Sequence, residues 1–209
     1  MNRRLYSVLF MFLITLVFAS GVTLVQRAHN NKIAANKEAK LQKVILQVLN
    51  IPVAPDVGND ELARLFDTNI KMSRLSDRDL YTAFDQDDKT PRAYAFPVSG
   101  PGFWGPISAM VAVDAAASAI IKIDFYQHQE TPGLGARITE PWFKKQFAEL
   151  TLDSGTSPYF TLTPVALRKE TGELDAITGA TQTSRAIDAF LNRELNNIIK
   201  ELSNGKKEG

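Results

Sequence analysis

One segment of the sequence gathers glycine and small hydroxyl residues directly before a helical pattern. Residues 175–184 read Asp-Ala-Ile-Thr-Gly-Ala-Thr-Gln-Thr-Ser, and the apolar residues after them recur at helical spacing. Free backbone N–H groups and the positive end of the dipole at a helix start attract anions, phosphate above all. Simple N-capping by Thr183 or Ser184 is the alternative, but it leaves the residues from Asp175 to Thr181 unexplained. The segment therefore favours an anion site.

A second segment combines polar side chains with glycine and one leucine. Residues 126–135 read Tyr-Gln-His-Gln-Glu-Thr-Pro-Gly-Leu-Gly, and a strand is expected to end at Tyr126. The proline and the two glycines let the backbone approach a ligand closely. Taken alone, an ordinary surface turn is the simpler interpretation. The alternative is a site for a flat heterocycle with a polar edge, contacted by His128, Glu130, Thr131 and Leu134.

A third segment, Gly100 to Gly105, matches the pattern G-x-G-x-x-G. In a dinucleotide-binding fold this motif opens a helix that holds the pyrophosphate. Here Pro106 follows, and residues 107–113 have a strand pattern, so we reject that interpretation. The segment instead predicts a turn that presents Phe103 and Trp104, either to the core or as an aromatic platform beside a ligand.

Together these motifs resemble those of a family of covalent FMN-binding subunits. The stretch Asp175–Thr181 is similar to the family's flavinylation motif D-x-x-(S/T)-G-A-T, and Glu130–Gly135 is similar to its second hallmark. An N-terminal membrane helix is the third shared feature. The family comprises the G subunit of Rnf complexes, which are ion-translocating ferredoxin:NAD oxidoreductases, and the C subunit of sodium-pumping NADH:quinone oxidoreductase. The resemblance covers residues 1–25 and about 90–200.

The resemblance implies an FMN joined through its phosphate to the hydroxyl of Thr181. A threonine hydroxyl does not react with FAD unaided, so a flavin transferase is an expected partner, with Asp175 serving its recognition. Arg168 or Lys169 would either contact the phosphate or remain solvated. No metal site and no catalytic residue are expected, because the flavin carries the redox chemistry. By analogy, the other cofactor-binding residues are Thr178, Gly179, Ala180, Glu130, Thr131, Leu134, Gly135 and Trp104.

The function implied by the resemblance is that of an electron-carrier subunit in a membrane-bound ion-translocating oxidoreductase. Such a chain is a redox subunit of a translocase, works beside other membrane subunits and has no independent catalysis. The short body favours the G subunit of the Rnf type. Two segments, Gly-Phe-Trp-Gly-Pro and Phe-Tyr-Gln-His-Gln-Glu, favour the C subunit of the sodium pump, which stays the alternative. A membrane-anchored assembly or sensor protein without redox activity is the remaining alternative.

The composition excludes several other classes of site and partner. Among 209 residues there is no cysteine and there are two histidines, which excludes disulfides, thiolate metal sites and multi-histidine metal centres. The formal net charge of +1 gives no electrostatic footprint for nucleic acid. The length of 209 residues suits one compact domain plus a short appendage, and an apolar fraction of 44% with balanced charge argues against low-complexity disorder.

The N-terminal stretch is apolar enough to contact a lipid bilayer. Residues 5–25 carry no charge and match the roughly 20 residues that a helix needs to cross the hydrocarbon. A cleaved signal peptide is the alternative, but its apolar core usually spans about 7–15 residues. Arg3 and Arg4 favour a cytoplasmic N-terminus, although basic residues also follow the span. We therefore expect a single-pass protein of the inner (plasma) membrane, with its soluble domain on the periplasmic or extracytoplasmic side.

The expected fold class is α+β, with a single N-terminal transmembrane helix followed by one FMN-binding domain of mixed sheet flanked by helices. The expected divisions are a membrane anchor (1–27), an amphipathic helical stalk (28–58) and the covalent FMN-binding domain (59–209). Residues 51–90 carry no signature. Apolar periodicity predicts strands at 92–98, 107–113, 121–125 and 161–167, and helices at 140–150 and 184–202, with Ser184 as the N-cap of the last.

Overall fold

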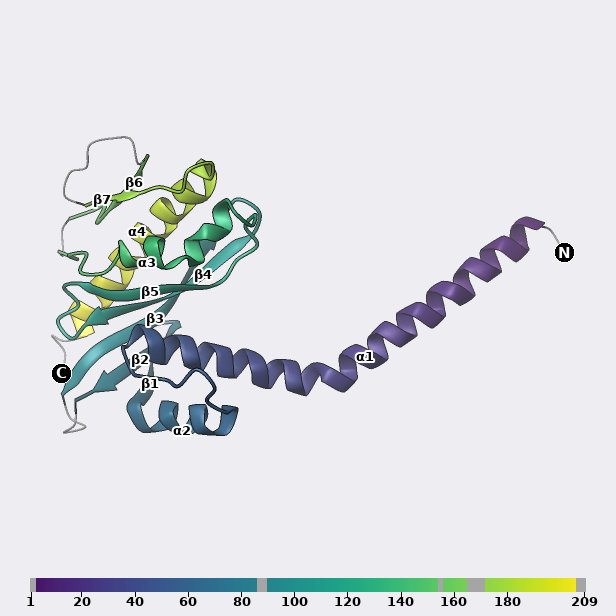
Figure 1. Ribbon diagram of the computed structural model, residues 1–209, viewed down its shortest axis with the longest axis horizontal. Coiled ribbons are helices and arrows are strands. Elements are labelled where there is room, and N and C mark those ends of the chain that lie inside the picture. Colours follow the sequence, from purple (N-terminus) through teal and green to yellow (C-terminus); the bar gives the residue numbers. More distant parts are fainter. Residues whose placement is uncertain (1–2, 86–89, 154–155, 165–171, 206–209) are drawn as a thin grey trace. The chain divides into compact units, whose positions relative to one another are not determined.

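A computed structural model describes residues 3–85, 90–153, 156–164 and 172–205. Its internal contacts divide the chain into two compact units, Met1–Lys40 and Leu41–Gly209. The first helix, α1 (Arg3–Val48), contributes residues to both units (Figure 1). The predicted divisions at residues 27 and 58 stay predictions.

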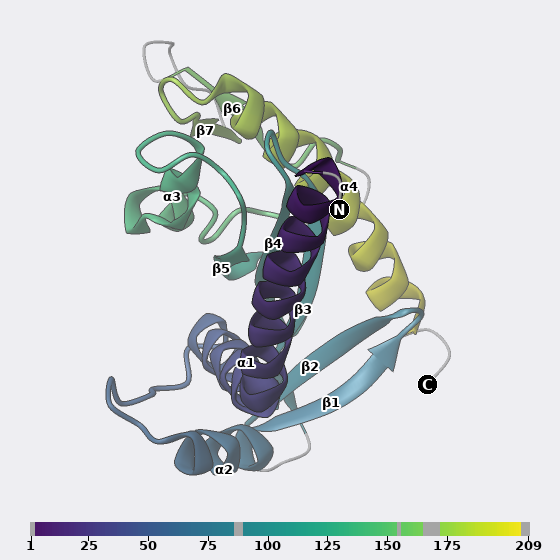
Figure 2. The ribbon, with the colours of Figure 1, turned by 90° about the vertical axis from the view of Figure 1, so that its right-hand side faces the viewer.

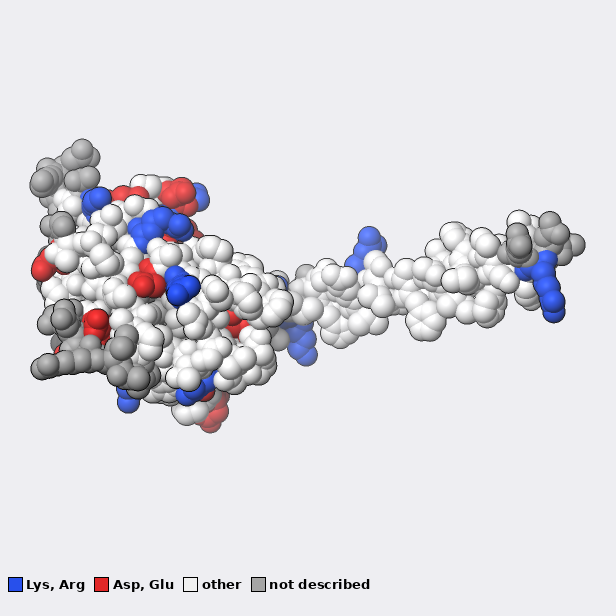
Figure 3. All heavy atoms as spheres, turned by 90° about the horizontal axis from the view of Figure 1, so that it is seen from above, with Lys and Arg blue, Asp and Glu red and all other residues white. Residues whose placement is uncertain are grey.

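The first unit is helical and apolar over most of its length. Leu5–Arg27 has a mean hydropathy of 2.6 with none of its most apolar window buried, so it is long and apolar enough to cross a membrane. Figure 3 shows the uncharged helix surface between basic residues. The hydroxyls of Thr15 and Thr23 donate to the carbonyl oxygens of Met11 and Ala19, each at 2.8 Å. These bonds satisfy the hydroxyls within the helix, as a lipid environment requires.

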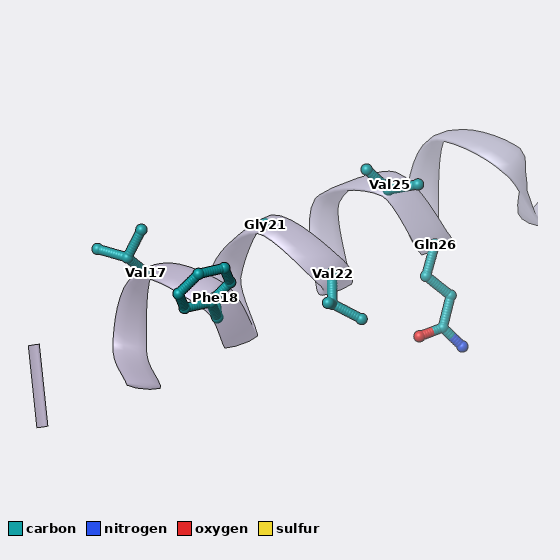
Figure 4. Close-up of a pocket in the computed structure, with 6 residues that line it drawn as sticks. All are labelled: Val17, Phe18, Gly21, Val22, Val25 and Gln26. Atoms are coloured by element: carbon teal, nitrogen blue, oxygen red, sulfur yellow. The ribbon is translucent and has the colours of Figure 1, made fainter. Parts of the chain in front are cut away.

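One glycine interrupts the surface of this apolar helix. A Cβ added at Gly21 would meet nothing within 4 Å. The missing side chain leaves a shallow groove on the helix (Figure 4), lined by Val17, Phe18, Val22, Val25 and Gln26.

The second unit is built on a five-stranded antiparallel sheet whose strands follow chain order (Figure 1). Each strand pairs with its neighbour in the sequence. The predicted strands at 92–98, 107–113 and 121–125 are confirmed as the last three of the sheet. The strands are β1 (Ile70–Leu75), β2 (Arg78–Phe84), β3 (Pro91–Pro101), β4 (Pro106–Asp114) and β5 (Ile120–Gln127).

One face of this sheet packs against the last helix, α4 (Thr181–Gly205). Both ribbon views show α4 running along the sheet (Figures 1 and 2). The helix approaches β3 closely because Gly100 has no side chain: a Cβ there would lie 2.3 Å from Cγ of Phe190. The predicted apolar stripe of this helix is confirmed as buried, with Ile187, Phe190, Leu191, Leu195, Ile198 and Ile199 each at most 3% exposed.

The other face holds the end of α1 and helix α2 (Asn59–Asn69). Apolar residues of α1 from Val44 to Leu49 are buried in this unit. Arg92 Nη2 donates to Leu49 O at 3.1 Å, and Lys122 Nζ donates to Gln47 O at 3.1 Å. Both cations donate to carbonyl oxygens at the C-terminal end of α1 and interact favourably with the negative end of the helix dipole. The last turns of α1, from Val44 to Val48, therefore pack within the second unit, whereas Ile33 of the same apolar pattern is exposed.

Shorter elements lie between β5 and α4. They are a 3-10 helix, η1 (Gly135–Thr139), then α3 (Pro141–Lys145) and a parallel pair of strands, β6 (Thr161–Thr163) and β7 (Glu173–Asp175). Figure 2 shows β6 and β7 beside α4, which β6 contacts. Antiparallel and parallel strands flanked by helices confirm the α+β class. The predicted strand at 161–167 is present as β6, and its end at 165–167 lies outside the described residues.

The predicted helix at 140–150 is wrong beyond Lys145, where α3 ends. Glu149 adopts a φ of 64°, which no α-helix contains. Its N–H donates to Ile120 O at 2.8 Å, and Ile120 N donates to Leu150 O at 3.0 Å. The chain thus leaves the helix to pair with β5, while the aromatic residues Phe143 and Phe147 of the predicted stripe remain fully buried.

Candidate functional site

The candidate anion site lies in the link between β7 and α4. Gly179 has a φ of +80°, the left-handed conformation that glycine adopts without strain. Ala180 N donates to Ile177 O at 3.0 Å, and Ile177 N donates to Ser184 Oγ at 3.1 Å. The helix begins at Thr181, so the prediction of Ser184 as N-cap is wrong. The Ser184 hydroxyl instead lies in the first turn of α4 and holds the preceding loop against the helix.

Thr181 is exposed at the first position of α4, and Thr178 and Gly179 beside it are exposed as well. The backbone N–H groups of the first helical turn have no acceptor within the helix. They and the helix dipole create a positive electrostatic potential around the Thr181 hydroxyl. Ala180 is 7% exposed and anchors the loop in the core. An anionic group bound to Thr181 would thus be stabilised while its outer side remains open to solvent.

Asp175 ends β7, before the loop that leads to Thr181. The side-chain amide of Gln146 holds its backbone, since Asp175 N donates to Oε1 at 2.6 Å and Nε2 donates to Asp175 O at 3.2 Å. Its side chain is half-buried. Asp175 is therefore fixed in place on the same link as Thr181, but it lies at the strand end and not in the helical turn.

Glu130 is buried, with 5% of its surface exposed, and its carboxylate joins two other segments. Oε1 accepts the N–H groups of Phe103 at 2.8 Å and Trp104 at 3.2 Å. Oε2 accepts the hydroxyl of Thr183 in the first turn of α4 at 2.7 Å. His128 Nδ1 accepts the Glu130 N–H at 3.2 Å. The three sequence motifs therefore meet at this one carboxylate.

Two other residues of the second motif, Leu134 and Gly135, lie close to the first motif, residues 175–184. A Cβ on Gly135 would lie 2.6 Å from both Glu130 Oε2 and Thr183 Oγ1, so only glycine leaves room for that hydrogen bond. A Cβ on Gly179 would lie 3.0 Å from Cδ2 of Leu134. Thr131 is exposed, and its carbonyl accepts the N–H groups of Leu134 and Ala136, each at 3.1 Å.

Exposed apolar side chains surround this junction. Phe103 is 53% exposed, Trp104 is 63% exposed and Leu134 is 43% exposed. The rings of Phe103 and Trp104 meet edge to face, with centroids 4.9 Å apart. The turn Gly100–Gly105 could present these rings to the core or to a ligand. The interpretation as core packing is wrong, because both rings are exposed to solvent. Large solvent-exposed apolar groups that lie close together mark a binding site for a ligand or a partner.

Two other expectations concern charged groups. Arg168 and Lys169, the candidate phosphate contacts, lie outside the described residues. Within the parts of the chain that the structure describes, no group of three or more acidic, histidine or cysteine side chains is arranged to hold a metal ion.

Thr183 is a member of the site that the motifs do not single out as a cofactor contact. Thr183 is 2% exposed, and its hydroxyl partner Glu130 lies 53 positions earlier in the chain. No local periodicity connects two residues so far apart. The only signal in the sequence is a second threonine two positions after Thr181, which is equally well explained by N-capping.

Comparison with known sequences places these motifs in one family. Residues 102–196 match the family model of the FMN-binding domain. The C subunit of the Na(+)-translocating NADH-quinone reductase of Chlamydia pneumoniae is 31% identical over 147 residues, which cover 59% of this chain and 46% of that protein. The G subunit of the ion-translocating oxidoreductase complex of Stutzerimonas stutzeri is 34% identical over 167 residues, which cover 78% of this chain and 66% of that protein.

A third relative is the G subunit of the proton-translocating ferredoxin:NAD(+) oxidoreductase complex of Clostridium ljungdahlii. It is 31% identical over 131 residues, which cover 63% of this chain and 66% of that protein. The chain thus spans less than half the length of the first relative and about two thirds of the other two.

Solved structures show the same fold. The C subunit of the Na(+)-translocating NADH-quinone reductase from Parabacteroides distasonis superimposes with a TM-score of 0.69 at 23% identity, covering 83% of this chain and 96% of that one. The Shewanella oneidensis protein NqrC gives a TM-score of 0.65 at 20% identity, covering 79% and 99%. With the motif residues gathered at the start of α4, the family-model match identifies residues 102–196 of this chain as a member of the FMN-binding domain family.

Proposed function

We propose that this chain carries FMN esterified to Thr181 and passes electrons within a membrane-bound ion-translocating oxidoreductase. The observation that carries the proposal is the exposed Thr181 hydroxyl at the start of α4, in the helical turn that Glu130 bonds to the backbone of the exposed Trp104. The matching family model covers all of these residues. The proposed role is that of an Rnf-type G subunit, and the C subunit of the sodium-pumping NADH:quinone oxidoreductase is the alternative.

The residues present fit both halves of FMN. The N–H groups of the first turn of α4 suit the phosphate, and the exposed loop at Thr178 and Gly179 leaves it accessible. Trp104 and Leu134 offer apolar surface to the flat ring, and Thr131 offers a hydroxyl to its polar edge. When bound, FMN supplies the electron-transfer chemistry, while the protein sets its orientation and electrostatic environment.

The covalent bond requires a second protein. In the proposed step, Thr181 Oγ1 loses its proton and bonds to the flavin-side phosphorus of FAD, the pyrophosphate bond breaks, and AMP leaves. Within the described part of the chain, the Thr181 hydroxyl makes no hydrogen bond to a carboxylate or an imidazole that could take this proton, so a flavin transferase supplies the base. Asp175, held by Gln146 at the end of β7, belongs to the surface that this enzyme recognises.

The matched test uses two exposed threonines, one at the attachment position and one outside the motif. The full chain is produced together with a flavin transferase, and flavin fluorescence is recorded in the denaturing gel. Thr181→Ala should abolish the fluorescent band, because the attacking hydroxyl is gone. Thr161→Ala should keep it, since Thr161 is an exposed threonine of β6 that lies outside the motif. A fluorescent Thr181→Ala variant refutes the attachment site, and a wild-type chain without flavin refutes the electron-carrier role in favour of an assembly or sensor protein.

The proposed topology places the chain in the inner membrane with one crossing, at Leu5–Arg27, and the domain outside the cytoplasm. It also assigns the chain to a complex with other membrane subunits. The absence of cysteine allows a clean test. Met72→Cys, at a residue 61% exposed on β1, should react with a membrane-impermeant maleimide in intact cells. Asn2→Cys should react only after lysis, and the reverse labelling pattern would refute this orientation.

A further inference from the structure

Glu130 is placed differently from a residue that would contact the flavin ring. Its side chain is buried, whereas Trp104 and Leu134, which would contact the ring, are exposed. Both carboxylate oxygens are already engaged by protein donors: two backbone N–H groups on Oε1 and one hydroxyl on Oε2. The carboxylate is therefore committed to holding the protein together.

The two segments that Glu130 joins have different tasks in the proposed site. One is the turn Gly102–Gly105, closed by a bond from Gly102 N to Gly105 O at 2.8 Å, which presents Trp104. The other is the first turn of α4, which begins at Thr181 and includes Thr183. Charge-assisted hydrogen bonds to a carboxylate are shorter and stronger than neutral ones. The bridge thus fixes the position of the aromatic turn relative to the attachment helix.

Glycines on both sides make the space for this bridge. A Cβ on Gly102 would lie 2.5 Å from Glu130 Oε1, and a Cβ on Gly135 would lie 2.6 Å from Oε2. Side chains at either position would displace the carboxylate. Two separate positions must therefore be glycine if the carboxylate is to stay where it is. This requirement concerns the geometry of the hydrogen bonds and is separate from the burial of apolar surface.

We propose that Glu130 is a positioning residue that holds Trp104 against the flavin ring carried by Thr181; this inference rests on the proposed function. The Trp104 side chain is too exposed for core packing to fix it, so its placement depends on its backbone. Glu130 supplies the acceptor for that backbone N–H and for the one before it. Without the carboxylate, the turn and the helix lose their common anchor, and Trp104 moves away from the ring.

The readout is the fluorescence of the attached flavin, which a tryptophan in contact with the ring quenches by electron transfer. Fluorescence of the folded full chain in detergent is divided by that of the same sample in denaturant. Covalent flavin content is measured separately in the denaturing gel. Trp104→Leu is the reference for complete loss of quenching. A loss of stability alone does not change the ratio for molecules that are still folded.

Glu130→Ala should raise the folded-state fluorescence several-fold, toward the Trp104→Leu value, without loss of attached flavin. Glu130→Gln should keep the wild-type ratio, because its Oε1 still accepts both N–H groups and its Nε2 reaches the Thr183 hydroxyl. If Glu130→Ala does not fold, Thr183→Val and Thr183→Ser decide. Valine removes the donor and should raise the ratio, whereas serine keeps the hydroxyl and should not.

Three results would overturn the inference: wild-type quenching in a folded Glu130→Ala chain, wild-type quenching in Thr183→Val, or no change in Trp104→Leu. Each of these leaves the covalent flavin, and hence the proposed function, intact. Failure of the proposed function would give a different result: the wild-type chain would show no fluorescent band in the denaturing gel.

Discussion

Substituting alanine for Gly135 tests the packing at the centre of the site most severely. The added Cβ would lie 2.6 Å from both Glu130 Oε2 and Thr183 Oγ1, the two atoms of the bridging hydrogen bond. Contacts under 3.0 Å force something to move. Because the nearest atoms belong to two buried side chains that bond to each other, neither moves without breaking that bond.

The cost of Gly135→Ala follows from two terms. Overpacking in a tight interior costs about 1–3 kcal/mol. Losing a hydrogen bond to a charged group costs about 1.5–3 kcal/mol. A total near 3 kcal/mol or more is therefore expected, and for a chain of this size each kcal/mol lowers the midpoint of thermal unfolding by about 2–4 °C. The expected fall is therefore at least about 6–12 °C.

The matched control is Gly133→Ala in the same loop. A Cβ there would meet nothing within 4 Å, but its φ of +73° disfavours alanine, at a cost of about 1–2 kcal/mol. Thermal unfolding of each full chain in detergent is followed by tryptophan fluorescence. Gly135→Ala should unfold at a clearly lower temperature than Gly133→Ala. Equal midpoints would show that the space around Glu130 is not as restricted as the structure has it.

Two further substitutions test α4. Gly100→Ala should cost at least about 1–3 kcal/mol, measured by urea unfolding, because its Cβ would lie 2.3 Å from the Phe190 ring; an unchanged midpoint would contradict the close contact of helix and sheet. Burial raises the pKa of Asp188 above 3.8, against the lowering effect of hydrogen bonds from Leu162 and Asn192. A raised pKa means that the folded chain holds this proton to higher pH than the unfolded chain. Its contribution to stability is therefore present below pH 3.8 and lost as the pH rises through the folded-state pKa. Over that pH range the free energy of unfolding of Asp188→Asn should rise relative to that of the wild type. Parallel curves of the two free energies against pH would exclude the effect.

Elements with a strong local pattern were predictable from the sequence. Residues Ile121 to Phe125 alternate between apolar and polar types, and β5 is buried on one face accordingly. The stripe of α4 repeats at helical spacing and faces the sheet. In both elements one face is buried and the other solvated, so the periodicity of the sequence reflects the structure directly.

The first two strands show why other elements gave no signal. β1 is exposed over most of its residues on both faces, while Leu80 to Ala83 of β2 are buried in succession. Neither arrangement produces alternation. The helix expected to reach Leu150 ends early because Glu149 N donates to Ile120 O and Ile120 N donates to Leu150 O, tertiary hydrogen bonds that its own segment cannot encode.

The site was predictable as separate motifs but not as an assembly. Glycine and threonine spacing near Thr181 indicates an anion site by local rules. That Glu130 turns inward to Thr183, instead of outward to the ligand, depends on a contact across 53 positions. Only the fold brings those residues together, so the distinction between a ligand contact and a positioning residue requires the structure.

The chemical state of the Thr181 hydroxyl in protein taken from its native membrane is the most direct test of the proposed function. Trypsin releases residues 170–185 as one peptide that contains Thr178, Thr181 and Thr183. Fragmentation of this peptide in a mass spectrometer should locate one added FMN, less one water, on Thr181. A peptide recovered wholly unmodified, or modified at another residue, would contradict the proposal.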